Sequence, residues 1–105
     1  CRVWPRGKVD EDLRAPLRSE VPALLLSGSD DPATPPAYAS EVAREFTRRL
    51  ELVLEGFGHG QLTAPCVDRI MAQFVARGSV DALDVSCVRA ARPLAFFTSL
   101  NGPPP

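Results

Sequence analysis

The sequence predicts an α/β fold of the order strand, helix, strand, helix, with a parallel sheet that is only partly present. Two short apolar runs, at residues 21–27 (VPALLLS) and 50–54 (LELVL), each lead into a glycine-containing loop. One amphipathic segment lies between the runs and another follows the second, the order typical of parallel strands joined by helices. Two strands and two helices leave much of the apolar surface uncovered. We therefore expect an incomplete core and a larger parent protein.

Length and charge exclude several classes of protein. At 105 residues the chain holds one domain at most, and 45% hydrophobic residues place it among globular proteins. The net charge of −1 predicts neither nucleic acid nor an anionic membrane as a partner. No apolar run approaches the roughly 20 residues that span a bilayer. The chain begins at Cys1 with a polar segment and no secretory signal, which we interpret as a fragment or a processed product.

The first half of the chain contains an irregular lead-in, a strand and a helix. Residues 1–20 are charged and proline-containing, so we expect at most a helical turn there. The continuous apolar run 21–27 predicts a strand buried on both faces. Thr34 before Pro35 predicts a helix with a hydroxyl N-cap, ending at about Arg49. Three apolar residues recur every fourth position and predict one buried stripe: Tyr38, Val42 and Phe46.

The second half begins with a strand at 50–54, which is closed by a glycine-rich loop. Apolar residues at helical spacing predict a second helix over residues 66–77, with Gly78 as its C-terminal stop. Beyond it we expect an extended tail. The predicted organisation is a lead-in at 1–20, the α/β part at 21–97 and a proline-rich tail at 98–105.

Each predicted strand is followed by one residue with catalytic chemistry. Asp31 follows the first strand, and His59, the only histidine, follows the second between two glycines. The carboxyl ends of parallel strands share one edge of the sheet, where functional loops gather. An aspartate beside an imidazole fixes its tautomer and stabilises the imidazolium, as in a serine-hydrolase triad. No G-x-S-x-G motif occurs, so we expect the nucleophile to lie outside this chain.

Both residues also have simpler explanations. The sequence Asp30-Asp31-Pro32 is typical of turns and helix caps, and a lone histidine is commonly a surface or structural residue. The placement of the two residues after consecutive strands favours catalysis. The chain has no CxxC or Cys/His ligand spacing, so we predict no metal, and no cofactor is implied.

The three cysteines leave two possibilities open. Cys66 and Cys87, 21 residues apart, pair in an oxidising compartment, and Cys1 then needs a partner outside this chain. Alternatively, all three thiols are reduced.

Nearly the whole chain resembles a known family. The stretches VPALLLSGSDDPATPPAYASEVA, LELVLEGFGHG and CVDRIMAQFVARGSVDALDVSC are similar to the C-terminal domain of α/β-hydrolases related to bacterial tripeptidyl aminopeptidases, the TAP-like proteins. The opening Cys1-Arg2-Val3-Trp4-Pro5 resembles the C-x-x-W-P stretch that precedes this domain, and the likeness fades after about residue 97. It implies the C-terminal part of an α/β-hydrolase fold, with the triad acid at Asp31 rather than Asp30 and the triad histidine at His59.

The resemblance also implies an activity and a compartment. Members of this kind are exported enzymes, secreted or periplasmic, that release short peptides from amino termini or hydrolyse esters and amides. It implies a Cys66–Cys87 disulfide, a peptide, ester or amide substrate, and a missing N-terminal hydrolase half as partner. We expect these 105 residues to be inactive alone.

Two alternatives remain. One is a standalone, non-catalytic binding module that descends from such an enzyme. The other is an esterase or another α/β-hydrolase chemistry, such as a dehalogenase-like or epoxide-opening enzyme with an upstream aspartate nucleophile. In that case Asp31 and His59 keep their roles.

Overall fold

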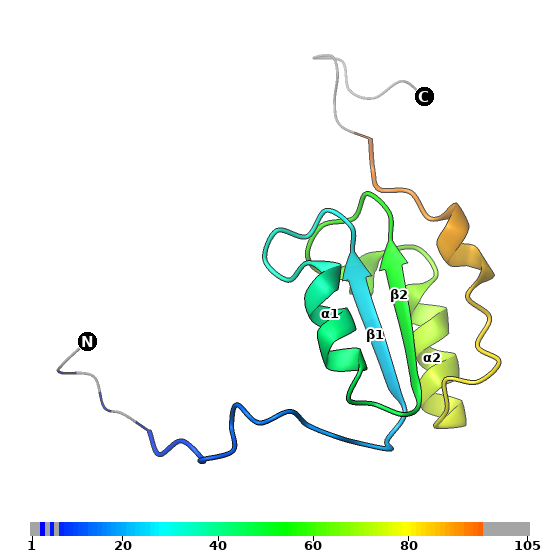
Figure 1. The fold of residues 1–105 in the computed structure, drawn as a ribbon. Helices are drawn as coiled ribbons and strands as arrows, with labels where there is room; N and C mark the ends of the chain where they lie inside the picture. The colour runs from blue at the N-terminus through cyan, green and yellow to red at the C-terminus, as the bar shows by residue number, and fades with distance from the viewer. Residues whose placement is uncertain (1–2, 4, 6, 96–105) are drawn as a thin grey trace.

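The computed structural model describes residues 3, 5 and 7–95 (Figure 1). Its main elements are β1 (Ala23–Gly28), α1 (Pro36–Ala43), β2 (Arg49–Leu54) and α2 (Val67–Arg77). Two short 3-10 helices, η1 (Gln61–Thr63) and η2 (Ser86–Ala90), flank α2 in sequence. The strands pair in parallel, from Ala23 opposite Arg49 to Gly28 opposite Leu54. The predicted α/β order and parallel pairing are therefore confirmed. Among the described residues, no helix is both long and apolar enough to cross a membrane.

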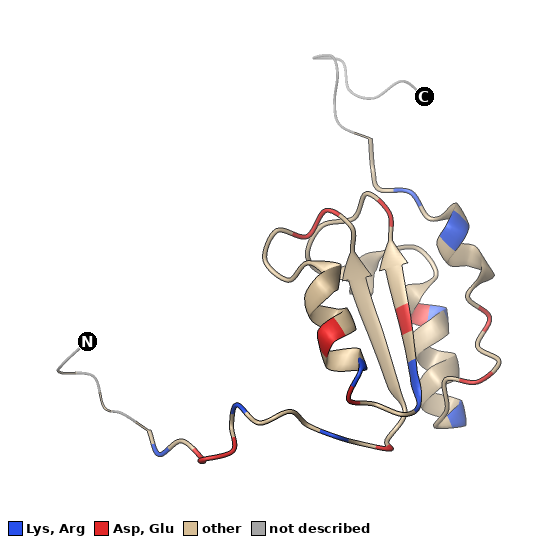
Figure 2. Ribbon diagram, viewed as in Figure 1, with Lys and Arg blue, Asp and Glu red and all other residues tan. Residues whose placement is uncertain are grey.

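The two helices lie on opposite faces of the sheet. Ser40 of α1 donates a hydrogen bond of 2.8 Å to the Glu51 carboxylate of β2, whereas Leu54 of the same strand packs against Val67 of α2. Side chains an odd number of positions apart on a strand point to opposite faces. The sheet is thus the middle of three layers (Figure 1). The charged positions of β2, visible in Figure 2, belong to Arg49 and Glu51, whose ion pair of 3.7 Å lies on the α1 side.

The core forms on the α2 side of the sheet. Leu54, Val67 and Ile70 are its largest fully buried side chains. Leu54 and Val67 form one cluster with Ala64, and four partly buried side chains pack against this cluster: Leu26, Phe57, Met71 and Val88. The largest buried side chains therefore lie where α2 and η2 cover the even-numbered positions of the strands, whereas the buried residue of α1 is Ala43.

The first strand differs from its prediction. It begins at Ala23, and its residues 23–26 are only partly buried, whereas the apolar run predicted burial on both faces. The reason is that β1 pairs with β2 alone, so its other edge faces no strand among the described residues. The expectation of a strand was correct, and the expectation of burial on both faces was wrong for this chain.

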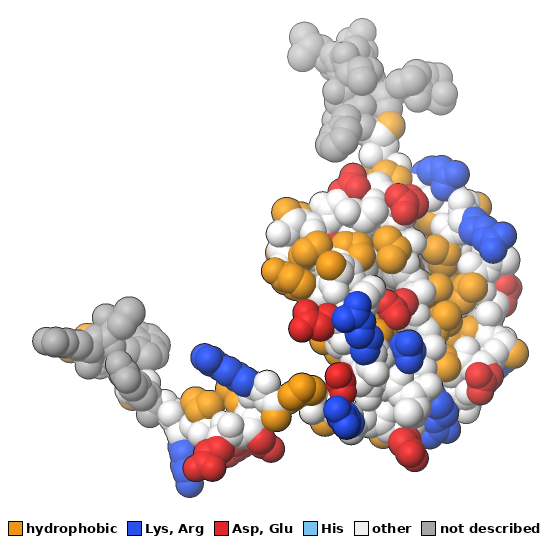
Figure 3. All heavy atoms as spheres, viewed as in Figure 1, with side chains coloured by type: hydrophobic (Ala, Val, Ile, Leu, Met, Phe, Trp, Pro, Cys, Tyr) orange, Lys and Arg blue, Asp and Glu red, His pale blue; other side chains and the backbone are white. Residues whose placement is uncertain are grey.

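The first helix is shorter than predicted, because it ends at Ala43 and not near Arg49. The chain then turns, and Phe46 forms a parallel bridge with Ser19 of the lead-in, which the sequence did not predict. The predicted buried stripe is also wrong here, since Tyr38 is 59% and Val42 is 53% exposed. Figure 3 shows hydrophobic side chains on the surface over the α1 region. Among the described residues, none buries Tyr38 or Val42.

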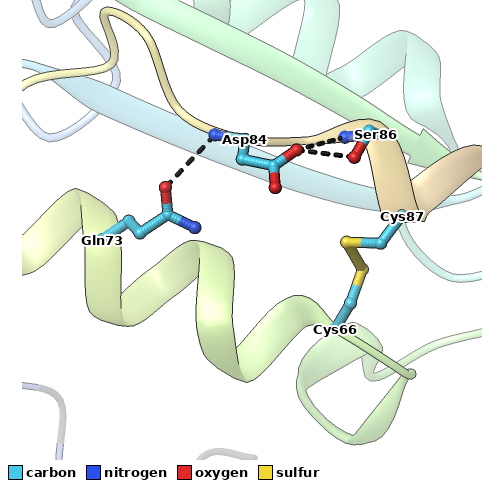
Figure 4. Close-up of a disulfide and its surroundings, with 5 residues drawn as sticks. All are labelled: Cys66, Gln73, Asp84, Ser86 and Cys87. Atoms are coloured by element: carbon cyan, nitrogen blue, oxygen red, sulfur yellow. Dashed lines mark hydrogen bonds between the residues drawn. A yellow bond between two sulfur atoms is a disulfide. The ribbon is translucent and has the colours of Figure 1, made fainter.

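The second helix matches its prediction closely. It runs from Val67 to Arg77, and the following Gly78 caps it with a φ of 59° that suits glycine. A Cys66–Cys87 disulfide joins the start of α2 to η2 across 21 residues (Figure 4), so the predicted pairing is present. The η2 turn lies in a segment that we expected to be an extended tail. Cys1, Trp4 and the proline-rich tail lie outside the described residues, as does the end of the predicted α/β part at residue 97.

Candidate active site

Asp31 lies in the loop after β1 and is buried, with 5% of its surface exposed. Its Oδ1 atom accepts hydrogen bonds from the backbone amides of Ala33 at 2.9 Å and Thr34 at 3.0 Å. This local turn fixes the Oδ1 side of the carboxylate with amides of its own loop. Its neighbour Asp30 is exposed and accepts a side-chain hydrogen bond only from Ser29, at 2.7 Å. Of the two aspartates, Asp31 is the one that the fold holds in a defined orientation.

These hydrogen bonds determine the charge of Asp31. The Thr34 backbone amide, followed by the Thr34 hydroxyl, holds the pKa of the Asp31 carboxyl well below its usual value. Desolvation acts in the opposite direction, and the contacts with His59 and the Ala33 amide lower the pKa further. Hydrogen bonds to the charged form of a carboxyl favour that form. Asp31 is therefore an anion at neutral pH.

His59 meets Asp31 across the end of the sheet. The imidazole Nδ1 lies 2.9 Å from Asp31 Oδ2. Because the ionised carboxylate has no proton to give, Nδ1 carries the hydrogen and donates it; in the neutral ring the lone pair is then on Nε2. The hydrogen bonds that His59 makes with described side chains all involve Nδ1, and 68% of its side chain is exposed. The structure thus brings the two predicted residues together and leaves Nε2 open to solvent.

Thr34 joins the pair and was not predicted to do so. Its hydroxyl donates to Asp31 Oδ2 at 2.7 Å, and its oxygen lies 3.2 Å from His59 Nδ1. The prediction that this hydroxyl caps α1 is wrong, because the N-cap is Pro35 and it has no side-chain cap. A hydrogen bond to a charged carboxylate is stronger than one to a neutral amide. Pro36 also removes one of the two amide hydrogens, at the second and third helical positions, that such a cap uses.

The two loops are joined to each other by short polar contacts. The Asp30 amide donates to the Phe57 carbonyl at 3.0 Å, and the Gly56 amide donates to the Ser29 hydroxyl at 2.8 Å. A β-carbon at Gly28 would overlap the carbonyl oxygens of Phe57 and Gly58, so this position requires glycine. The loop after β1 therefore holds the histidine loop at close range. Figure 2 shows acidic positions in both loops.

Sequence reasoning found the pair but missed the residues that support it. Thr34 was interpreted as a cap, and neither Ser29 nor Gln61 was given a role. The available signal was their position, since each is a polar residue within three positions of Asp31 or His59.

The arrangement can move a proton, but it contains no nucleophile. Imidazole Nε2 can accept a proton from a hydroxyl or thiol, while the Asp31 carboxylate stabilises the resulting imidazolium. Among the described side chains, only Thr34 and Asp31 hydrogen-bond His59. Across residues 3, 5 and 7–95, no group of His, Cys, Asp and Glu side chains is arranged to hold a metal ion.

Comparison with known proteins gives one match. The sequence model of the α/β-hydrolase family described as TAP-like protein matches residues 1–87, which include both loops and both disulfide cysteines. No curated protein and no solved structure matches the chain.

Proposed function

Because the chain belongs to the TAP-like family of α/β-hydrolases, we propose that it is the C-terminal part of a serine hydrolase. In this proposal it supplies the acid and the base of the catalytic triad. The observation that carries the proposal is the 2.9 Å hydrogen bond between the buried Asp31 and the exposed His59, at the carboxyl end of two parallel strands. Of the described residues, these two combine a fixed carboxylate with a free imidazole nitrogen.

The proposed mechanism is acyl transfer. A serine elsewhere in the parent enzyme attacks the scissile carbonyl, and His59 Nε2 takes the proton of its hydroxyl. The imidazolium, stabilised by Asp31, then gives this proton to the leaving amine or alcohol. Water enters next, loses a proton to Nε2 and attacks the acyl-enzyme, and the serine leaves with the proton that His59 returns. Asp31 stays ionised throughout, as its lowered pKa favours.

The parent enzyme is, in this proposal, an exported peptidase that releases short peptides from amino termini. The Cys66–Cys87 disulfide supports the location, because such bonds persist in oxidising compartments outside the cytosol. Hydrolysis of esters by the same site is the alternative, and the ratio of kcat/KM for matched ester and anilide substrates decides between them.

The partner of this chain is the N-terminal half of the hydrolase domain. Two features of the surface support this part of the proposal. The free edge of β1 faces no strand among the described residues. Tyr38 and Val42 of α1 are more than half exposed. Exposed apolar faces and open sheet edges mark surfaces that another part of a protein covers.

The proposal is tested by kinetics on the intact hydrolase with tripeptide p-nitroanilides that have a free amino terminus. His59→Ala removes the general base, so we expect kcat to fall about 10⁴-fold or more. Asp31→Ala should have a smaller but still large effect.

Asp30→Ala is the matched control, since Asp30 is adjacent but exposed and makes no contact with the imidazole. It should retain most of the activity. Near-normal turnover of His59→Ala would sink the proposal.

A further inference from the structure

The residues on either side of His59 have no side chains that could pack and hold the ring. His59 lies between Gly58 and Gly60, and a β-carbon on either glycine would meet nothing within 4 Å. Gly60 has a φ of 93°, which other residues rarely adopt. The imidazole itself is largely exposed. The position of the ring therefore depends on hydrogen bonds.

Gln61 makes a hydrogen bond that bears directly on this loop. Its side chain is buried, and its Nε2 donates to the carbonyl oxygen of Gly58 at 2.6 Å. Gly58 and Gln61 stand on either side of His59 and Gly60, so this bond closes a four-residue ring around the histidine backbone. The same carbonyl lies against Gly28, where β1 ends and the loop of Asp31 begins.

The backbone of Gln61 is anchored independently of that bond. It begins η1, and its carbonyl accepts a hydrogen bond of 3.0 Å from the Ala64 amide. The η1 turn contacts both β1 and α2, and Ala64 belongs to the buried cluster. Gln61 thus connects the buried cluster to the glycine-flanked segment that carries His59.

We propose that Gln61 is a positioning residue for the general base. Its amide fixes the Gly58 peptide and thereby sets the distance and angle at which His59 Nδ1 meets Asp31 Oδ2. The catalytic consequence rests on the proposed function, but the effect on the imidazole does not. A displacement of about 1 Å at a reacting group costs roughly 100-fold in rate. Removing the Gln61 side chain should therefore lower kcat less than removing the His59 side chain does.

The variant Gln61→Met tests this role, because methionine has a similar length and no hydrogen-bond donor. The matched control is Gln73→Met on α2. The Gln73 side chain accepts a hydrogen bond of 3.2 Å from the Asp84 amide, away from the histidine loop (Figure 4). Both substitutions remove one bond between a glutamine side chain and the backbone. A second variant, Gln61→Glu, keeps the shape and replaces the donor with a carboxylate, so it serves if Gln61→Met does not fold.

The experiment is ¹⁵N NMR of labelled histidine in the intact polypeptide that carries this chain, with the His59 signal identified by its loss in His59→Gln. Above the titration of the ring, the unsubstituted protein should show a protonated Nδ1 and an unprotonated Nε2. In Gln61→Met we expect a mixture of tautomers, and a kcat about 10- to 100-fold lower with KM nearly unchanged. Gln73→Met should change neither quantity.

Unchanged imidazole signals in both Gln61 variants would overturn the inference, as would an equal effect of Gln73→Met. A protonated Nε2 in the unsubstituted protein would overturn it together with the proposed function. If His59→Ala stays active while Gln61→Met still alters the tautomer, the proposed function fails and the positioning role of Gln61 stands.

Discussion

The two faces of the sheet differ in how well this chain covers them. On the α2 face, Val67 and Leu54 are fully buried, and a disulfide holds η2 against the start of α2. On the α1 face, Val42 is 53% exposed, and the strand residues on that side include the exposed Arg49 and Glu51. Both faces belong to the same two strands, so the difference arises from what the chain supplies to cover them.

The difference shows which half of the fold this chain completes by itself. The histidine loop leads into η1 and α2 on the closed face, so the base rests on a packed core. The aspartate loop leads into α1 on the open face, and its carboxylate is held by local hydrogen bonds instead. A longer hydrolase, as we propose, would cover the open face without disturbing either loop.

A large expected effect on one face and a small one on the other come from two matched valine-to-alanine substitutions. Val67→Ala removes a fully buried side chain and should lower the free energy of unfolding by about 2 kcal/mol or more, from lost burial and the cavity left behind. Val42→Ala in α1 should change it by less than about 0.5 kcal/mol, because Val42 is exposed and alanine favours helix. Urea titration followed by circular dichroism measures both. Equal losses would remove the distinction between the faces.

The same two substitutions, made in the intact hydrolase, test whether another part of the protein covers α1. If the missing half covers α1, Val42→Ala should there cost roughly 1–2 kcal/mol, a value typical of a partly or fully buried valine. A cost that stays near zero in the intact enzyme would show that nothing packs on this face.

The disulfide should stabilise the closed face by a similar amount. Replacing Cys66 and Cys87 together by serine releases a loop of 21 residues, for which the chain-entropy relation gives about 3 kcal/mol. Denaturation midpoints of the double variant and the oxidised parent measure this loss. Because the bond lies on the α2 side, its removal should not change how the free energy of unfolding falls at acidic pH. If stability is lost at a different acidic pH in the double variant, the disulfide also supports the aspartate loop.

The hydrogen bonds of Asp31 should make the free energy of unfolding depend on pH in the acidic range. The pKa of Asp31 is lowered in the folded protein from an ordinary value of 3.8. The unfolded chain therefore binds more protons, and stability from this group is complete above about pH 5 and is lost as the pH falls through the folded pKa. Asp31→Asn should remove this part of the loss of stability at acidic pH. If Asp31→Asn and the parent lose stability in parallel below pH 4, the carboxylate is not held as described.

The smallest effect is expected on the open face of β2. The Arg49–Glu51 ion pair is exposed and measures 3.7 Å. Such pairs contribute about 0–1 kcal/mol and are screened by salt. Arg49→Ala should therefore change the denaturation midpoint very little, and less still in 0.5 M salt. A large fall in the denaturation midpoint would show that the exposed side chains of this face stabilise the fold.

Local patterns predicted the elements and the pair, but they did not predict what covers each face. Short apolar runs, Gly78 and the spacing of α2 are local signals, and the structure agrees with them. The burial of Tyr38 and Val42 was predicted wrongly, because amphipathic spacing marks a face that needs cover and does not say whether this chain provides it. The end of α1 was missed for a related reason, since Phe46 pairs with Ser19 across 27 residues.

The site shows the same division. Asp31 and His59 were predicted because each follows a strand, a relation that can be read along the chain. The contacts of Thr34 and Gln61 depend on backbone conformation: Thr34 turns its hydroxyl to the carboxylate because two prolines follow it, and Gln61 reaches back to Gly58 across a left-handed glycine. These conformations have no periodic signature in the sequence.

The central claim, that Asp31 and His59 activate a nucleophile supplied from outside this chain, is tested most directly by labelling the intact polypeptide with a fluorophosphonate probe. Mass spectrometry should locate the probe on one serine outside these 105 residues. Labelling should be strongly slowed in His59→Ala and hardly changed in Asp30→Ala. A probe attached within residues 1–105, or labelling at the same rate without His59, would contradict the account.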